Sequence, residues 1–308
     1  MSVVQGIGLG ERQQGSGQPP PEPGRAARRR STPYLLLLPG IAWLVVFFAV
    51  PIFTLLSTST QTRPDGAEIG VYRQTFRLAN YVDSLSEYAV VFGRSFLYAL
   101  IATVAALLIS YPLAYAIAFK SGRWRNILLV LVVAPFFVSF LLRTVAWKQI
   151  LADEAWVADS LRFLHVLGSQ DNIINTAPAV VIGITYNFLP FMILPIYASL
   201  ERVDPRLVEA AGDLYANGLT ALRRVTIPLS MPGIVAGTLL TFIPAAGDYI
   251  NSALLGNRDT TMVGNVIDAR FLRVVDYPTA AVLSVTLMVS ILVLVGIYIR
   301  RAGTEELV

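Results

Sequence analysis

Long apolar stretches, separated by polar and charged segments, make up most of this chain. Each is near the roughly 20 residues that cross the hydrocarbon core of a bilayer. The stretches cover residues 34–58, 93–119, 126–150, 178–199, 233–255 and 277–299. Proline recurs inside them, which membrane helices tolerate because their neighbours satisfy the freed backbone groups. The pattern predicts six transmembrane helices and excludes a β-barrel, whose strands alternate in short segments.

The composition agrees with a membrane protein. The chain has 308 residues, of which 55% are hydrophobic and 14% charged, whereas soluble domains have about 25% charged residues. It contains no cysteine and one histidine, His165. Disulfides, thiolate metal sites and cysteine nucleophiles are therefore excluded, and we expect no metal site.

The basic residues predict the orientation. Arg28–Arg30, Lys120, Arg123 and Arg125 lie on one side of the predicted helices, and the loops of the other side carry more acids. Cytoplasmic loops are rich in Lys and Arg, so both termini are expected to be cytoplasmic. The net charge of +4 is then a topology signal, and we expect no nucleic-acid partner.

This pattern divides the chain into one membrane domain and two tails. Residues 1–32 form a basic tail that cannot bury a core and is expected to be disordered. The membrane domain covers residues 33–301, and residues 302–308 form a short C-terminal tail.

The segment at 200–232, between the fourth and fifth predicted helices, is polar but patterned. Asp204-Pro205 is a helix start, because Asp caps free N–H groups and Pro fits the first turn. Asn217-Gly218 predicts a turn before a second short amphipathic piece. Two interpretations stay open: a helical hairpin whose exposed Leu219 and Leu222 contact a protein partner, or a helix on the membrane surface.

The same segment carries a motif. Glu209-Ala210-Ala211, followed by Asp213 and then by Ile227-Pro228-Leu229, resembles the EAA motif of ABC-importer permeases. In that family the loop forms coupling helices that dock on an ATPase subunit. The resemblance implies an ATPase-coupling role for Glu209, Ala210, Ala211, Asp213, Tyr215, Gly218, Leu219 and Leu222. The family usually has Gly where this chain has Tyr215, and Asn217-Gly218 is expected to supply the bend instead, because both tolerate left-handed backbone angles.

A more specific resemblance covers roughly residues 34–300. Pro244–Tyr249, Leu254–Gly256 and Met262–Phe271, with Leu142–Trp147 and Leu189–Met192, are similar to permeases for spermidine and putrescine, in particular to the first permease partner. This resemblance implies an all-α integral membrane protein with the type I ABC importer permease (MetI-like) fold.

The resemblance also implies the partners. The chain is expected to form half of a pore in the bacterial inner membrane, as a heterodimer with a second permease subunit. Two ATPase subunits would bind ATP and Mg, and a soluble binding protein would deliver a small organic cation to the outer loops at 59–92, 151–177 and 256–276. No cofactor is expected on this chain.

Two ionisable residues lie within the predicted spans. Arg143 and Asp248 are each roughly 22–25 Å along an outward-running helix at ~1.5 Å per residue, so the two are predicted at similar depth. Charges in membrane spans are paired or face water. Either Asp248 faces a translocation path for a cation, or it forms an ion pair with Arg143. Tyr249, Trp147 and Tyr186 either line the path with cation–π faces or pack between helices.

Catalytic motifs are absent from the sequence. It contains no Gly-x-x-x-x-Gly-Lys-Ser/Thr phosphate loop, so the chain is not expected to be an enzyme or to hydrolyse ATP by itself. Two alternatives remain: a secondary transporter driven by an ion gradient, with Asp248 and Arg143 as the coupling pair, and an importer permease for another small solute. Co-purification of a nucleotide-binding subunit distinguishes the first from an ABC permease.

Overall fold

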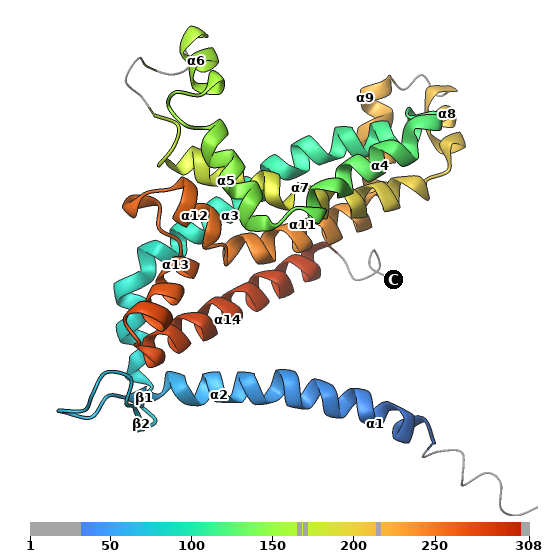
Figure 1. Cartoon of the computed structure of the whole chain (residues 1–308). Helices are drawn as coiled ribbons and strands as arrows, with labels where there is room; N and C mark the ends of the chain where they lie inside the picture. The colour runs from blue at the N-terminus through green and yellow to red at the C-terminus, as the bar shows by residue number, and fades with distance from the viewer. Residues whose placement is uncertain (1–31, 165–167, 169–171, 214–216, 303–308) are drawn as a thin grey trace, which may run out of the picture. The chain divides into compact units, whose positions relative to one another are not determined.

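The computed structural model describes residues 32–164, 168, 172–213 and 217–302 (Figure 1). His165, Tyr215 and almost all of the two predicted tails lie outside these residues. The chain forms two compact units, Met1–Phe53 and Thr54–Val308, which are described separately below.

The first unit is an apolar helix. It consists of α1 (Thr32–Leu44), a π-helical turn η1 (Val45–Ala49) and the start of α2 (Val50–Ser59). The helical run from Leu37 to Ser59 is long and apolar enough to cross a membrane. This agrees with the first predicted span at 34–58.

The second unit begins with a hairpin and a very long helix. The strands β1 (Gln61–Thr62) and β2 (Arg73–Gln74) pair antiparallel, and α3 (Ala79–Phe119) follows. The sequence predicted that this helix begins only at residue 93. It begins earlier because its first turns are amphipathic, with Tyr88 and Phe92 buried in a cluster with α13 and α14.

The third predicted span is broken. Instead of one helix over 126–150, the structure has η2 (Gly122–Trp124), α4 (Arg125–Val133), η3 (Ala134–Phe137) and α5 (Phe140–Ile150). The two halves are bent by 97°. Pro135 has no N–H that could donate to the carbonyl oxygen of Leu131, so one helical hydrogen bond is missing. Val138 and Ser139 then adopt extended backbone angles, which end the helix. The prediction of a continuous helix was wrong here.

The predicted fifth helix over 233–255 is also shorter than expected. Helix α11 (Met231–Ala246) ends at Gly247, and a separate helix α12 (Ile250–Leu255) follows. Asp248 therefore lies in the turn between two helices and not inside a straight span.

The outer loops of the sequence analysis contain helices as well. They hold α6 (Trp156–Phe163), η5 (Arg258–Thr260), α13 (Val263–Asp268) and η6 (Ala269–Arg273). The helix α14 (Tyr277–Ala302) then completes the described chain.

The core of the second unit is built on α7 (Ala177–Glu201), which packs against α3 and α11 (Figure 1). Small residues allow the close approach that is usual between membrane helices. A Cβ added at Gly233 would lie 2.5 Å from the carbonyl oxygen of Pro195, and one at Gly237 would lie 2.9 Å from the sulfur of Met192.

The number of possible membrane spans agrees with the prediction. In the described residues, four helices are long and apolar enough to cross a membrane, and two bent pairs raise the number to as many as six. The predicted all-α membrane fold is confirmed, with two of its six spans broken.

Candidate functional site

The segment predicted to couple to an ATPase forms two short helices that are side by side (Figure 1). Helix α8 (Pro205–Asp213) begins after Asp204, whose Oδ1 accepts a hydrogen bond of 2.9 Å from the backbone N–H of Arg206. Helix α9 (Gly218–Ala221) is followed by a π-helical turn η4 (Leu222–Thr226) and by α10 (Ile227–Leu229). The predicted helix start at Asp204-Pro205 is confirmed.

Asn217 caps the second helix. The Oδ1 atom of Asn217 accepts a hydrogen bond of 2.8 Å from the backbone N–H of Thr220, which makes Asn217 the N-cap of α9. Its backbone is extended, with φ −68° and ψ 161°. Asn217 therefore does not use the left-handed angles that the sequence suggested, and residues 214–216 lie outside the described residues.

Most of the predicted coupling residues are accessible. Glu209, Ala210, Asp213, Gly218 and Leu219 are exposed, and 62% of Leu219 is exposed. Ala211 and Leu222 are half-buried. The segment thus exposes two carboxylates of α8 and an apolar side chain of α9, which are groups that a protein partner can bind.

A buried polar network surrounds Asp248. Its Oδ1 accepts a hydrogen bond of 2.8 Å from the backbone N–H of Asn251, and its Oδ2 accepts one of 2.7 Å from Nδ2 of the same residue. The Oδ1 atom of Asn251 accepts from Thr144 on α5, at 3.2 Å, and from Asn187 on α7, at 3.0 Å. Three helices, α5, α7 and α12, therefore meet at the side-chain amide of Asn251, which in turn holds the carboxylate.

The turn that carries Asp248 is held from a second side by α13. Asn265 donates through Nδ2 to the carbonyl oxygen of Tyr249 at 2.8 Å, and its Oδ1 accepts from the hydroxyl of Ser252. A Cβ at Gly264 would lie 2.5 Å from the carbonyl oxygen of Gly247. Only glycine therefore allows α13 to come this close to the turn.

A small pocket opens beside this turn. Its volume is about 250 Å³, and it is lined by Phe140, Gly247, Asp248, Tyr249 and Ile250. Asp248 is 6% exposed, whereas Tyr249 is 45% exposed. A carboxylate next to two aromatic rings is an arrangement that attracts a cation through charge and through the ring faces.

The other predicted path residues do not line this pocket. Trp147 and Tyr186 contact each other edge to face, with their ring centroids 5.2 Å apart. Trp147 packs against the main core cluster, and Tyr186 lines a separate, mostly apolar pocket. Of the five residues predicted for a path, the structure brings only Asp248 and Tyr249 into one pocket.

Arg143 forms no ion pair with Asp248 in the described part of the chain. Its side chain is buried, and its guanidinium lies over the rings of Phe136 and Phe140, at 5.6 and 5.5 Å from their centroids. Within the described residues, its Nε and Nη1 atoms have no hydrogen-bond partner. The prediction that Arg143 and Asp248 lie at similar depth assumed two straight helices. The third predicted span is broken before Arg143, and the fifth ends before Asp248.

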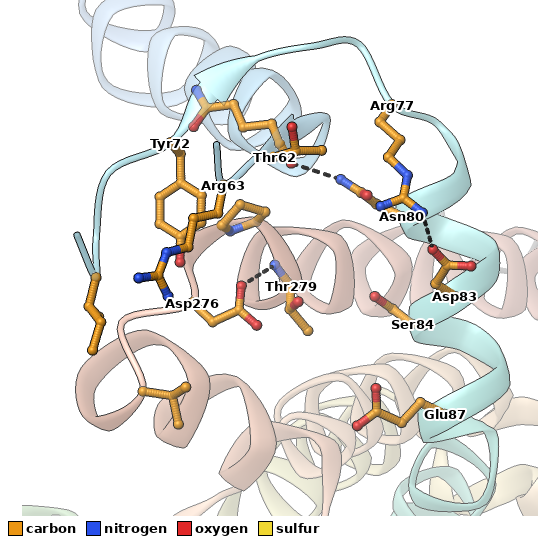
Figure 2. Close-up of a pocket in the computed structure, with 14 residues that line it drawn as sticks. Thr62, Arg63, Tyr72, Arg77, Asn80, Asp83, Ser84, Glu87, Asp276 and Thr279 are labelled. Atoms are coloured by element: carbon orange, nitrogen blue, oxygen red, sulfur yellow. Dashed lines mark hydrogen bonds and ion pairs between the residues drawn. The ribbon is translucent and has the colours of Figure 1, made fainter. Parts of the chain in front are cut away.

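A larger pocket lies at the hairpin, between the starts of α3 and α14 (Figure 2). Its volume is about 540 Å³. The hydroxyl of Tyr72 donates to the carbonyl oxygen of Val275 at 2.8 Å, and burial, with the nearby charge of Asp276, raises the pKa of this hydroxyl. Arg77 pairs with Asp83 at 2.9 Å.

The remaining acids of this pocket pair with one guanidinium, and Arg63 also lines the pocket. Arg270 pairs with Glu87 at 3.2 Å and with Asp276 at 3.5 Å. It also donates to the hydroxyl of Tyr88, and this hydrogen bond raises the pKa of Arg270. The pocket is therefore polar but nearly balanced in charge.

The sequence analysis missed the residues that hold Asp248. Thr144, Asn187 and Asn251 are uncharged polar residues inside the predicted spans at 126–150, 178–199 and 233–255. That placement was a usable signal, because a polar side chain inside a membrane span needs a partner.

With this geometry established, the chain was compared with known proteins. Residues 110–302 match the family model described as binding-protein-dependent transport system inner membrane component. The chain belongs to this family. It is a multi-pass permease of the bacterial inner membrane.

Related proteins of known name support the assignment over nearly the whole permease. The permease is 38% identical over 263 residues to the spermidine/putrescine transport system permease protein PotB of Escherichia coli. The alignment covers 85% of this chain and 94% of that protein. PotB of Haemophilus influenzae is also 38% identical, covering 84% and 90%. The inner membrane ABC transporter permease protein YdcU of Escherichia coli is 27% identical, covering 89% and 90%.

Solved structures show the same fold. A chain from a bacterial ABC transporter involved in the import of the acidic polysaccharide alginate superimposes on the permease with a TM-score of 0.65, at 18% identity, covering 89% of this chain and 96% of that one. A second structure of a bacterial alginate ABC transporter, in complex with a periplasmic protein that binds an alginate pentasaccharide, gives a TM-score of 0.62 at 19% identity.

Proposed function

We propose that the permease forms half of the translocation pore of an ATP-binding-cassette importer for a small organic cation, spermidine or putrescine. The observation that supports this solute most strongly is the identity of 38% to PotB, a spermidine/putrescine transport permease, over 85% of the chain. The chemistry of the small pocket agrees with it, because Asp248 is a buried carboxylate beside Tyr249 and Phe140. A protonated amine is a suitable ligand for such a pocket.

The energy for transport comes from partner subunits in this proposal. Two ATPase subunits bind ATP and Mg, and one of them contacts the surface formed by α8 and α9. The exposure of Glu209, Asp213 and Leu219 supports this contact. A second permease subunit completes the pore, and a soluble binding protein delivers the solute to the outer face.

The proposed mechanism is alternating access. Nucleotide binding closes the ATPase dimer, brings the two coupling segments together and opens the pore to the outside. The solute enters from the binding protein, and it leaves inward after hydrolysis. In this arrangement both termini are cytoplasmic, and the membrane domain at 33–301 is followed by a short cytoplasmic tail.

The ion-gradient alternative has less support. It used Arg143 and Asp248 as a coupling pair, and within the described residues these side chains form no pair. Family membership also favours a system that depends on a binding protein. An ATP-dependent uptake measurement separates the two mechanisms.

The test is uptake by the assembled complex in proteoliposomes, with ATP inside and with loaded binding protein outside. We expect labelled spermidine or putrescine to accumulate only with ATP. Asp248→Asn should weaken uptake by roughly tenfold or more, the usual effect of losing a charged partner. Thr241→Val, which removes a buried hydroxyl of α11 that has no partner within the described residues, is the control and should transport normally.

The outcomes of this test are separable. Normal uptake by Asp248→Asn would remove the cation site at Asp248 and leave the permease assignment standing. Failure of both polyamines, with ATP-dependent uptake of another solute, would replace the solute. Uptake that needs an ion gradient and no ATP would overturn the mechanism.

A further inference from the structure

Asn251 donates two hydrogen bonds to the carboxylate of Asp248. It is the second residue of α12, and it is fully buried. Its backbone N–H and its side-chain Nδ2 donate to the two different oxygens of Asp248, at 2.8 and 2.7 Å. A carboxylate held by two donors from one residue is fixed both in position and in rotation about its own axis.

The side chain of Asn251 is in turn fixed by two other helices. Its Oδ1 accepts hydrogen bonds from Nδ2 of Asn187 and from the hydroxyl of Thr144, which also lie within 3.1 Å of each other. A flipped amide would face the carboxylate with an oxygen and face the Asn187 donor with its own N–H groups. Only one orientation of the Asn251 amide satisfies its neighbours, and that orientation directs Nδ2 at Asp248.

A buried cation, Arg143, contacts a residue that lines the pocket of Asp248. Arg143 is adjacent to Thr144 in α5 and is 8% exposed, with Nε and Nη1 lacking hydrogen-bond partners in the described part of the chain. Its guanidinium lies over the ring of Phe140, and Phe140 also lines the pocket of Asp248. A buried cation without hydrogen bonds gains from a carboxylate partner, yet the two side chains form no pair.

We infer that Asn251 is a positioning residue for solute transfer. With Asn187 and Thr144 behind it, Asn251 keeps Asp248 directed at the pocket, where the carboxylate is available to a passing ammonium group instead of to Arg143. Asn251 acts through Asp248 and has no contact with the solute itself. This inference rests on the proposed function, in which the solute is an organic cation.

The first test is a double-mutant cycle in the uptake assay. Asn251→Leu, of similar size but without the side-chain Nδ2 donor, should raise the KM for the polyamine roughly tenfold, because one hydrogen bond to a charged group is lost while the backbone N–H stays. In an Asp248→Asn background the same change should add little, because the group on which Asn251 acts is already gone. A purely structural role predicts instead that the two effects multiply.

Thr241→Val provides the matched control. Thr241 is fully buried in α11, and within the described residues its hydroxyl has no partner. The substitution therefore removes a buried polar atom without touching the network, and uptake should stay at the wild-type level.

Asn187→Leu is the milder test variant, because it removes one hydrogen bond from Asn251 and leaves both donors on Asp248. Its KM should rise less than that of Asn251→Leu.

The second test does not depend on the solute. Electron cryomicroscopy of the assembled Asn251→Leu complex should show the Asp248 carboxylate rotated toward Arg143, with the two side chains paired.

An unmoved carboxylate in this structure, or effects that multiply in the double-mutant cycle, would overturn the inference. A wild-type complex that imports no polyamine would overturn only the proposed solute. The role of Asn251 would still be tested by the position of the Asp248 carboxylate in the Asn251→Leu structure. If the Asn251→Leu complex does not assemble, both tests are made with Asn187→Leu. In that variant, a wild-type KM together with an unmoved side-chain amide at Asn251 would overturn the inference.

Discussion

Single glycines on α7 and its neighbours control how closely the helices that surround Asp248 approach each other. A Cβ added at Gly183 would lie 2.3 Å from Cδ1 of Leu255 and 2.7 Å from Oδ1 of Asn251. Both atoms belong to α12, and the second belongs to the network that holds Asp248. The absence of a side chain at Gly183 is therefore a condition for the Asn187–Asn251 hydrogen bond.

We expect Gly183→Ala to destabilise the permease and to weaken uptake together. Overpacking of a well-packed site costs about 1–3 kcal/mol, and here it displaces Asn251 as well. Gly93→Ala on α3 is the control, because no described atom lies within 4 Å of the added Cβ. Thermal unfolding in detergent should show a lower Tm for Gly183→Ala and an unchanged or slightly higher Tm for Gly93→Ala. Equal Tm values for the two variants would contradict the packing described here.

At the scale of elements, helix breaks create the site. The third predicted span bends by 97° near Pro135, and the fifth ends at Gly247. After these breaks, Thr144 of α5 and Asn251 of α12 both accept a hydrogen bond from Asn187 of α7. Irregular backbone at membrane depth occurs where it is buried in protein or lines a cavity, and the turn at Asp248 meets both conditions.

The coupling segment is the second functional element, and Glu209 tests it. Glu209→Arg reverses an exposed charge on α8, so the proposed contact with an ATPase subunit should weaken and uptake should fall by tenfold or more. Binding-protein-stimulated ATP hydrolysis should fall with it. The control is Arg300→Glu, a reversal of an exposed charge in the last turn of α14, outside both the outer loops and the coupling segment. Unchanged uptake and stimulation in Glu209→Arg would count heavily against the coupling role.

For the whole molecule, the orientation in the membrane is the main prediction still to be tested. The basic residues predict that the coupling segment is cytoplasmic and the hairpin loop external. The sequence has no cysteine, so a single introduced cysteine reports its own side without interference. This makes the orientation accessible to a simple labelling experiment.

We expect a membrane-impermeant maleimide to label Glu68→Cys in intact cells and Arg206→Cys only after permeabilisation. Both positions are exposed, so a difference in labelling reports the side of the membrane and not burial. The reverse pattern would invert the proposed topology and would place α8 and α9 out of reach of a cytoplasmic ATPase. Labelling of both positions from outside would contradict the number of spans between them.

The sequence by itself determined the features that depend on local composition. The membrane class, the positions of the apolar spans and the helix start at Asp204 follow from neighbouring residues alone, because apolar length and capping are local properties. The coupling motif was recognisable for the same reason. The two broken helices were not predicted, since proline and glycine are common in spans that remain continuous.

Only the tertiary structure decided what surrounds Asp248. From sequence, a pair with Arg143 and a site open to solute were both possible. The choice depended on Asn187 and Thr144, which are 64 and 107 residues away from Asn251 in the chain. A buried polar group needs a hydrogen-bond partner, but the sequence does not specify which distant residue provides it. The packing of α5, α7 and α12 brings these three side chains together and leaves Arg143 without the carboxylate.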